Sequence, residues 1–278
     1  MENSEFPFTN RPEARSFEER ALQLQTDLDV IQSRYGVVVE LSQTTERQSD
    51  RLGFGRSISY EPVTQEAAAV PVAAIRENLA LYPPEYIHAL RVRKIKPVRN
   101  FRESSIGIQI KELGGIPVVK NGLIYIDVQS GHEIYVAENL HHELSHFTDR
   151  DFSRFGGRRK RGEWVRLNTA GGKAYQVNEE YFSNRAVDQE RPEGFASLYG
   201  SFNIEEDRAE VAKLIMLMGG AHGYLKNLME KDEVLKRKIL ATLAYMNDKS
   251  GGKIPDRFLD DLEAKIVNED YWGKGNIA

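Results

Sequence analysis

The chain has 278 residues, of which 40% are hydrophobic and 29% are charged, so it can bury one large or two small cores. Its 38 Lys and Arg residues face 42 Asp and Glu residues, and the net charge of −4 argues against a nucleic-acid-binding protein. The chain has no cysteine, which excludes disulfide bonds, thiolate metal ligands and cysteine nucleophiles.

The hydropathy pattern gives no sign of a membrane protein. No run reaches the roughly 18 apolar residues that a spanning helix needs, and the mean hydropathy is −0.52. The first ten residues lack a basic segment followed by an apolar stretch, so we expect no secretory signal in this sequence. The protein is then either cytoplasmic or exported by a signal that is not present here.

The first hundred residues alternate between helical and strand patterns. Apolar residues three and four apart predict an amphipathic helix over 14–35, and the β-branched run 37–41 predicts a strand. A second helix is predicted over 64–81 and ends at a pair of prolines. A strand pattern then begins at Ile87 and continues through 106–110.

A hairpin followed by a helix is predicted next. Asn121-Gly122 lies between two apolar runs, which predicts a hairpin over 118–126. Residues 130–133 have the form of a capping box, and an apolar stripe follows at helical spacing, so we expect a helix over about 131–149.

The second half is predicted to be loops and then helices. Residues 150–190 contain glycines and a basic run from Arg154 to Arg161, which indicate long loops. The basic run could attract an acidic substrate or nucleic acid, but a solvated loop is the favoured explanation. Helical patterns then cover the remaining part, in three segments near 205–218, 222–247 and 255–268.

Residues 142–146 have the pattern H-E-x-x-H, which is the main indication of a metal site in this sequence. A helix places His142 and His146 one turn apart on one face, where both imidazoles can bind one ion. Glu143 points beside that ion, in the position of a general base. The alternative is a solvated helix with incidental histidines. The metal site is favoured because the pair lies opposite the apolar stripe. The other histidines, His88, His132, His141 and His222, are expected at the surface or in the core.

A zinc site of this type needs a third protein ligand, and a carboxylate further along the chain is the best candidate. Glu206 and Glu210 share one face of a predicted helix, so one could bind the metal while the other orients a histidine. Glu206 also fits a capping box that begins at Asn203, in which it would only satisfy a backbone amide. Asp149 could orient His146, although a plain acidic helix end is the favoured interpretation.

Two segments together, H-E-x-x-H and Y-G-x-x-N-x-x-E-x-x-A-E over 199–210, resemble the gluzincin peptidases. They are most similar to the anthrax lethal factor-like group, which includes the Pro-Pro endopeptidases. The first motif is shared by many zinc peptidases, whereas a tyrosine seven residues before the glutamate is a much more specific feature. The resemblance covers only these two segments of the chain.

The resemblance implies a role for each matching residue. His142, His146 and Glu206 would bind one Zn²⁺ per chain, and Glu143 would be the general base. Tyr199 would stabilise the oxyanion. Glu210 would be the outer partner of a ligating histidine.

The implied fold is α+β and zincin-like, with a mixed sheet and an active-site helix in an N-terminal lobe over 1–150. A loop insertion and a helical C-terminal lobe over 151–278 would supply the third ligand. An extended peptide is expected along an edge strand at 123–128. His146 and Glu206 are 60 positions apart, more than we expect for compact family members, so the inserted loops leave substrate preference open.

The sequence therefore predicts a zinc-dependent endopeptidase that acts on a peptide or protein substrate. The main alternative is a catalytically inactive zincin-like protein with a binding or regulatory role. A nucleic-acid-binding regulator is a third and weaker possibility, because it needs a surface basic patch that the net charge does not favour.

Overall fold

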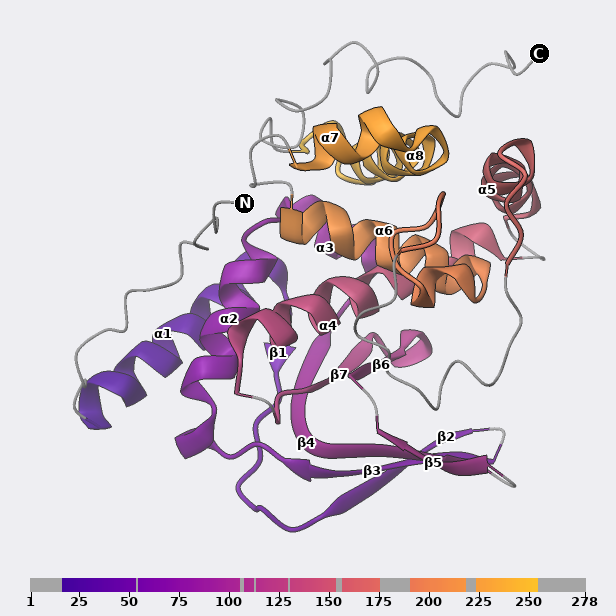
Figure 1. Cartoon of the computed structure of the whole chain (residues 1–278). Coiled ribbons are helices and arrows are strands. Elements are labelled where there is room, and N and C mark those ends of the chain that lie inside the picture. The colour runs from indigo at the N-terminus through magenta and orange to yellow at the C-terminus, as the bar shows by residue number, and fades with distance from the viewer. Residues whose placement is uncertain are drawn as a thin grey trace, which may run out of the picture.

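The computed structural model describes residues 17–53, 55–105, 108–112, 114–129, 131–153, 157–175, 191–218 and 224–254. It is an α+β structure in which helices gather on one side of a mixed sheet (Figure 1). Among the described helices, none combines the length and apolar character needed to cross a bilayer.

The sheet has the strand order β2-β3-β4-β7-β6, and β1 and β5 also pair with β4. The pairs β1–β4 and β4–β7 are parallel and the others are antiparallel, so the sheet is mixed as expected. The strands are β1 Val38–Val39, β2 Gln48–Gly53, β3 Arg56–Pro62, β4 Lys94–Ser105, β5 Ile108–Glu112, β6 Gly115–Val118 and β7 Leu123–Asp127.

The helices pack over the sheet and over each other, with α4 and α6 side by side near the middle of the molecule (Figure 1). The main core lies between them and the sheet, and a smaller cluster around Tyr60 and Phe101 covers the opposite sheet face. The helices are α1 Phe17–Tyr35, α2 Ala69–Leu79, α3 Pro84–Leu90, α4 Glu133–His146, α5 Arg158–Ala170, α6 Ile204–Met218, α7 Tyr224–Lys231 and α8 Glu233–Lys249.

The prediction of a strand pattern from Ile87 is wrong at its start. Pro84 is the first residue of α3, where a proline needs no hydrogen-bond donor, so the proline pair begins a helix after ending one. Ile87 is fully buried on α3, and the strand begins only at Lys94. The expected helix over 64–81 is also shorter, because residues 65–67 form a 3-10 turn before α2.

The hairpin over 118–126 is confirmed, with Val118 paired to Leu123. Its connection is a 3-10 turn over Val119–Asn121 that ends at Gly122, rather than a two-residue Asn-Gly turn. Gly122 has φ +66°, and a Cβ there would lie 2.7 Å from the carbonyl oxygen of Arg91, so glycine is required.

The expected edge strand at 123–128 is wrong, because β7 lies inside the sheet. It pairs with β4 on one side and with β6 on the other. The hairpin partner β6 therefore covers β7, and β6 ends the path of the sheet on this side.

The prediction of loops throughout 150–190 is also wrong, because α5 occupies Arg158–Ala170. Few residues of α5 are buried and many are charged, so the sequence shows no apolar period typical of a helix. Trp164 anchors it and is 1% exposed. Several predictions lie outside the described residues, namely those for Ile106, Arg154, the loop stretch 176–190, His222 and the segment 255–268. The predicted helix 222–247 is two helices, α7 and α8, divided at Asp232, whose side chain accepts a hydrogen bond from Leu235 N at 2.9 Å.

A buried ion pair fixes α6 against α8. Lys238 Nζ lies 2.7 Å from Asp207 Oδ2, and both side chains are fully buried. The indole N–H of Trp164 and the hydroxyl of Tyr175 also donate to Asp207 Oδ2, each at 2.9 Å. Because every partner comes from a different segment, this carboxylate sets the position of α6 along the molecule.

We predict that Lys238→Met lowers the free energy of unfolding by about 3 kcal/mol, because it leaves the Asp207 charge buried without its cation. Urea denaturation measures this change. The matched control is Lys236→Met on the exposed side of α8, which should cost about 0.5 kcal/mol or less. Equal effects of the two substitutions would show that the buried pair does not hold the helices together.

Candidate metal centre

Helix α4 presents two imidazoles from successive turns. The Nε2 atoms of His142 and His146 lie 3.1 Å apart. The apolar side of the helix, with Val136, Leu140 and Leu144, is buried in the main core, so the two histidines face away from the sheet core. This spacing follows from the helical repeat that the motif predicts.

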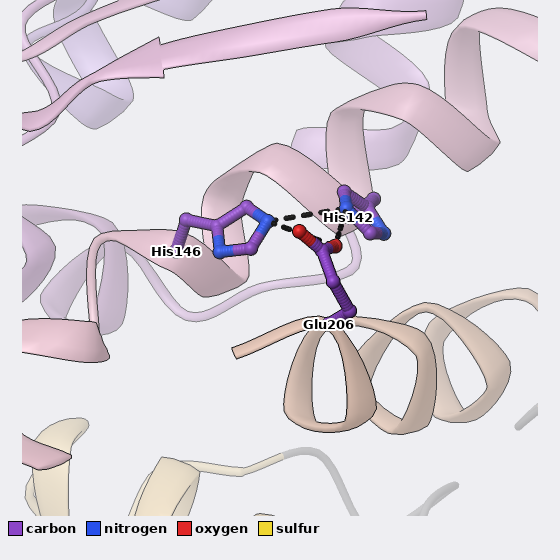
Figure 2. A group of neighbouring side chains, drawn as sticks. All are labelled: His142, His146 and Glu206. Atoms are coloured by element: carbon purple, nitrogen blue, oxygen red, sulfur yellow. Dashed lines mark hydrogen bonds and ion pairs between the residues drawn. The ribbon is translucent and has the colours of Figure 1, made fainter. Parts of the chain in front are cut away.

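Helix α6 supplies a carboxylate to the same point. Glu206 Oε2 lies 3.1 Å from His142 Nε2 and 3.6 Å from His146 Nε2. Figure 2 shows Glu206 reaching from one helix toward both histidines of the other. One ligand atom from each of the three residues lies within 4.8 Å of the others, which forms a His-His-Glu group suited to a metal ion.

Each histidine has a carboxylate behind it. His142 Nδ1 donates to Glu210 Oε1 at 2.8 Å, and His146 Nδ1 donates to Asp149 Oδ2 at 2.8 Å. These bonds leave the Nε2 atoms directed at each other and at Glu206, where they can bind a metal ion once they are deprotonated. Glu206 Oε2 is buried and accepts no hydrogen bond of normal geometry from the described residues. The donor set of two imidazoles and one carboxylate therefore fits Zn²⁺.

The pKa shifts in the metal-free group also indicate that positive charge is stabilised at its centre. Burial lowers the pKa of His142, but Glu206 and Glu210 raise it more, to about 9. The pKa of His146 is raised well above its ordinary value, since Asp149 and Glu206 outweigh the effect of burial. Burial raises the pKa of Glu210, but His142 and Lys213 lower it further, to about 2. Protons and a metal ion would therefore compete for the same atoms.

Glu143 lies next to the metal group and against strand β6. It is 6% exposed, and its Oε2 has no hydrogen-bond partner among the described residues. Burial raises the pKa of this carboxyl above its ordinary value, in spite of the two neighbouring histidines. A Cβ at Gly115 would lie 2.5 Å from Glu143 Cγ, so the backbone of β6 passes directly over this side chain. A buried carboxylate with a raised pKa and a free oxygen has the properties of a proton acceptor.

Tyr199 lies beside His142. Its ring centroid is 5.7 Å from that of His142, and the residue is 42% exposed. It begins a 3-10 turn over Tyr199–Ser201 that packs closely on α6, since a Cβ at Gly200 would lie 3.3 Å from Glu210 Cβ. Burial of the hydroxyl and the nearby Glu206 and Glu143 raise the pKa of Tyr199, so it is a neutral hydrogen-bond donor at pH 7.

All of these groups open onto one cleft with a volume of about 990 Å³. Its lining comes from β6, α4, α5, α6 and the turn at Tyr199, and from Leu52, Arg56 and Glu103 of the neighbouring strands. His142, Glu143, His146, Tyr199 and Glu206 all line it, whereas Glu210 lies behind His142.

The two alternatives for Glu206 and Asp149 are now separated by geometry. Asn203 Oδ1 accepts a hydrogen bond from Glu206 N at 2.9 Å, so Asn203 caps the helix, but the Glu206 carboxylate points to the histidines. Asp149 binds His146 directly, against the favoured interpretation of a plain helix end. His141 is fully buried and bonded to Tyr82, as expected for a core histidine.

One residue of this group had no signal in the sequence. Arg208 is 5% exposed, and its Nη1 donates to Asp149 Oδ1 at 2.8 Å. It also donates to Thr148 Oγ1, and its guanidinium lies 3.4 Å from the ring centroid of Phe152. Arg208 therefore holds Asp149 in place behind His146. Only the packing of α6 against the end of α4 reveals this role.

Comparison with known proteins adds little to the description of this site. No family model and no curated protein matches the chain. One crystal structure, of a protein from Bacteroides caccae proposed to be a zinc-binding metallo-peptidase, is similar over 93% of this chain and 95% of its own, with 14% identity and a TM-score of 0.49. A likeness this distant supports no conclusion about activity, which depends on the chain's own residues.

We predict that the protein binds about one zinc ion and that its affinity falls as the pH is lowered. At pH 7 the metal-free His142, with a pKa of about 9, carries a proton that zinc must displace. Each proton displaced should weaken binding about tenfold per pH unit below that pKa. Competition with a chelator at several pH values measures the affinity.

The control variants for this experiment are His142→Ala, which should lose the zinc, and His88→Ala at an exposed position of α3, which should retain it. An affinity independent of pH, or zinc retained by His142→Ala, would contradict the site.

We predict that Arg208→Met weakens zinc binding about tenfold, because Asp149 loses the group that holds it against His146. Elemental analysis after dialysis against a chelator gives the loss. Arg76→Met, which removes the partner of buried Asp27 away from the site, controls for general loss of stability. A zinc content equal to that of the control would show that Arg208 serves folding alone.

Proposed function

We propose that this chain is a zinc-dependent endopeptidase of the gluzincin type with a zincin-like fold. The observation that carries the proposal is the convergence of His142, His146 and Glu206 in an open cleft, beside a buried Glu143 whose Oε2 has no hydrogen-bond partner among the described residues. The proposal includes the division into an N-terminal lobe over 1–150 and a C-terminal lobe over 151–278 that supplies Glu206.

The three ligands would hold zinc through His142 Nε2, His146 Nε2 and the Glu206 carboxylate. When bound, zinc supplies a Lewis acid for the scissile carbonyl and lowers the pKa of a water molecule. Glu210 and Asp149 keep both imidazoles in the tautomer that binds metal through Nε2.

Glu143 and Tyr199 would carry the proton transfers and the charge. Glu143 accepts a proton from the attacking water and then donates it to the amine that leaves, so no covalent intermediate forms on the chain. The raised pKa of Glu143 suits a group that must both accept and donate near neutral pH. The hydroxyl of Tyr199 donates a hydrogen bond to the carbonyl oxygen as negative charge develops there.

The peptide would lie extended along β6. Among the described strands it pairs with β7 alone, and its residues line the cleft. An unpaired strand edge offers backbone donors and acceptors to any extended peptide, which favours binding with little dependence on side chains. The edge is short, so α5, α6 and the turn at Tyr199 must contribute the remaining contacts.

A binding or regulatory protein with a structural zinc is the alternative that the experiment must exclude. A structural site needs no buried, unpartnered carboxylate beside the metal and no opening onto a cleft of this size.

We predict that Glu143→Gln keeps its zinc but loses peptide hydrolysis by at least about 100-fold, because the amide cannot accept the proton. Tyr199→Phe should lower kcat by about 100-fold with a smaller effect on KM, because the hydroxyl acts mainly in the transition state. Cleavage of a peptide library, followed by mass spectrometry, measures both. Glu206→Ala should lose zinc as well as activity. Unchanged hydrolysis in Glu143→Gln would exclude the mechanism, and a zinc-loaded wild type that cleaves nothing would favour the regulatory protein.

A further inference from the structure

The charges that line the cleft pair with one another almost completely. On one wall, Arg56 contacts Glu103 between β3 and β4. On the other, Arg161 of α5 lies 2.5 Å from Glu205 of α6. Behind His146, Asp149 is neutralised by Arg208. The acidic groups left over, Glu143 and Glu206, belong to the proposed metal centre.

Arg150 is the exception among the described arginines and lysines of the cleft. Its side chain is 60% exposed, and its only ion-pair contact with the described residues is a long one, 3.7 Å from Nε to Asp151 Oδ1. Asp151 is already bound through Oδ2, by Lys249 at 2.6 Å and by Tyr245 at 3.0 Å. The guanidinium of Arg150 therefore brings a positive charge to the cleft that the protein hardly offsets.

The backbone beneath this side chain is held on several sides. Arg150 belongs to the 3-10 turn Asp149–Phe152, which directly follows α4. Asp149 is bonded to His146 and to Arg208, Asp151 is bonded to Lys249, and Phe152 is buried. The backbone of Arg150 is thus fixed next to Asp149, which orients the proposed zinc ligand His146. The guanidinium of Arg150 remains exposed to the cleft.

We propose that Arg150 is a specificity-determining residue that binds a carboxylate of the peptide substrate. The inference rests on the proposed function and adds to it the chemical class of substrate, a peptide with an acidic group near the scissile bond. A guanidinium binds a carboxylate through two parallel hydrogen bonds and keeps its charge at any working pH. The carboxylate can come from an Asp or Glu side chain or from the peptide C-terminus.

The test measures binding and cleavage separately. Zinc-loaded Glu143→Gln is titrated with short fluorescent peptides, each made with Glu and with the neutral Gln at one position, and each with a free and an amidated C-terminus. The same titrations use Glu143→Gln combined with Arg150→Gln, with Arg150→Glu, or with the control Arg166→Gln. Arg166 is exposed on α5 outside the cleft, so this control changes the net charge equally.

We expect a peptide with the carboxylate to bind about fivefold tighter than its neutral partner, and this ratio should fall to about one in Arg150→Gln. A third peptide with Lys at the same position completes the series, and in Arg150→Glu the preference should turn toward it, whereas Arg166→Gln should keep the original ratio. A ratio that follows the amidated ends assigns the C-terminal carboxylate, and one that follows the Glu and Gln pairs assigns a side chain.

Three results would overturn the inference: no dependence on a carboxylate, a dependence that survives Arg150→Gln, or an equal loss in Arg166→Gln. Cleavage by the wild type separates this inference from the proposed function. Carboxylate-dependent binding without any cleavage contradicts the peptidase alone, whereas cleavage that ignores acidic groups contradicts only the role of Arg150.

Discussion

Two imidazole nitrogens 3.1 Å apart, with a carboxylate oxygen beside them, are the arrangement on which the rest of this molecule depends. Such atoms repel unless a proton or a metal cation lies between them, so neighbouring groups must fix the orientation of the side chains. The carboxylates of Glu210 and Asp149 do this by accepting hydrogen bonds from the Nδ1 atoms of the two rings. Helix α4 packs closely on α6, which brings Glu206 within reach of both histidines.

Four residues in little more than one turn of α6 hold this arrangement in place. Glu206 reaches the histidines, and Asp207 binds Lys238 on another side of the helix. Arg208 binds Asp149, and Glu210 binds His142. Successive residues point about 100° apart, so a rotation of the helix by one residue would break every one of these contacts. The buried pair with Lys238 therefore fixes the rotation of α6 as well as its position.

Local patterns predicted α1, the hairpin, α4 and α6, because each carries a clear apolar period or a turn signal. The motif in α4 and the glutamates of α6 belong to those elements, so the parts of the candidate site could be found from the sequence.

The contacts between those parts could not be found in the same way. Arg208 looks like any exposed arginine until α6 meets the end of α4. Helix α5 was missed because one buried tryptophan anchors a mostly charged helix, and α3 because a proline can begin a helix as well as end one. The identity of the edge strand depended on which hairpin strand joins β4, which is a property of the assembled sheet.

Gly115 allows the backbone of strand β6 to lie directly against Glu143. Its backbone passes so close to Glu143 that a single methyl group would collide with that side chain at 2.5 Å. Strand β6 and the Glu143 side chain therefore lie in direct contact, with no room for a larger residue at position 115. If the proposed function holds, a peptide paired with β6 would lie one strand spacing from this carboxylate, and the missing side chain would be what allows that approach.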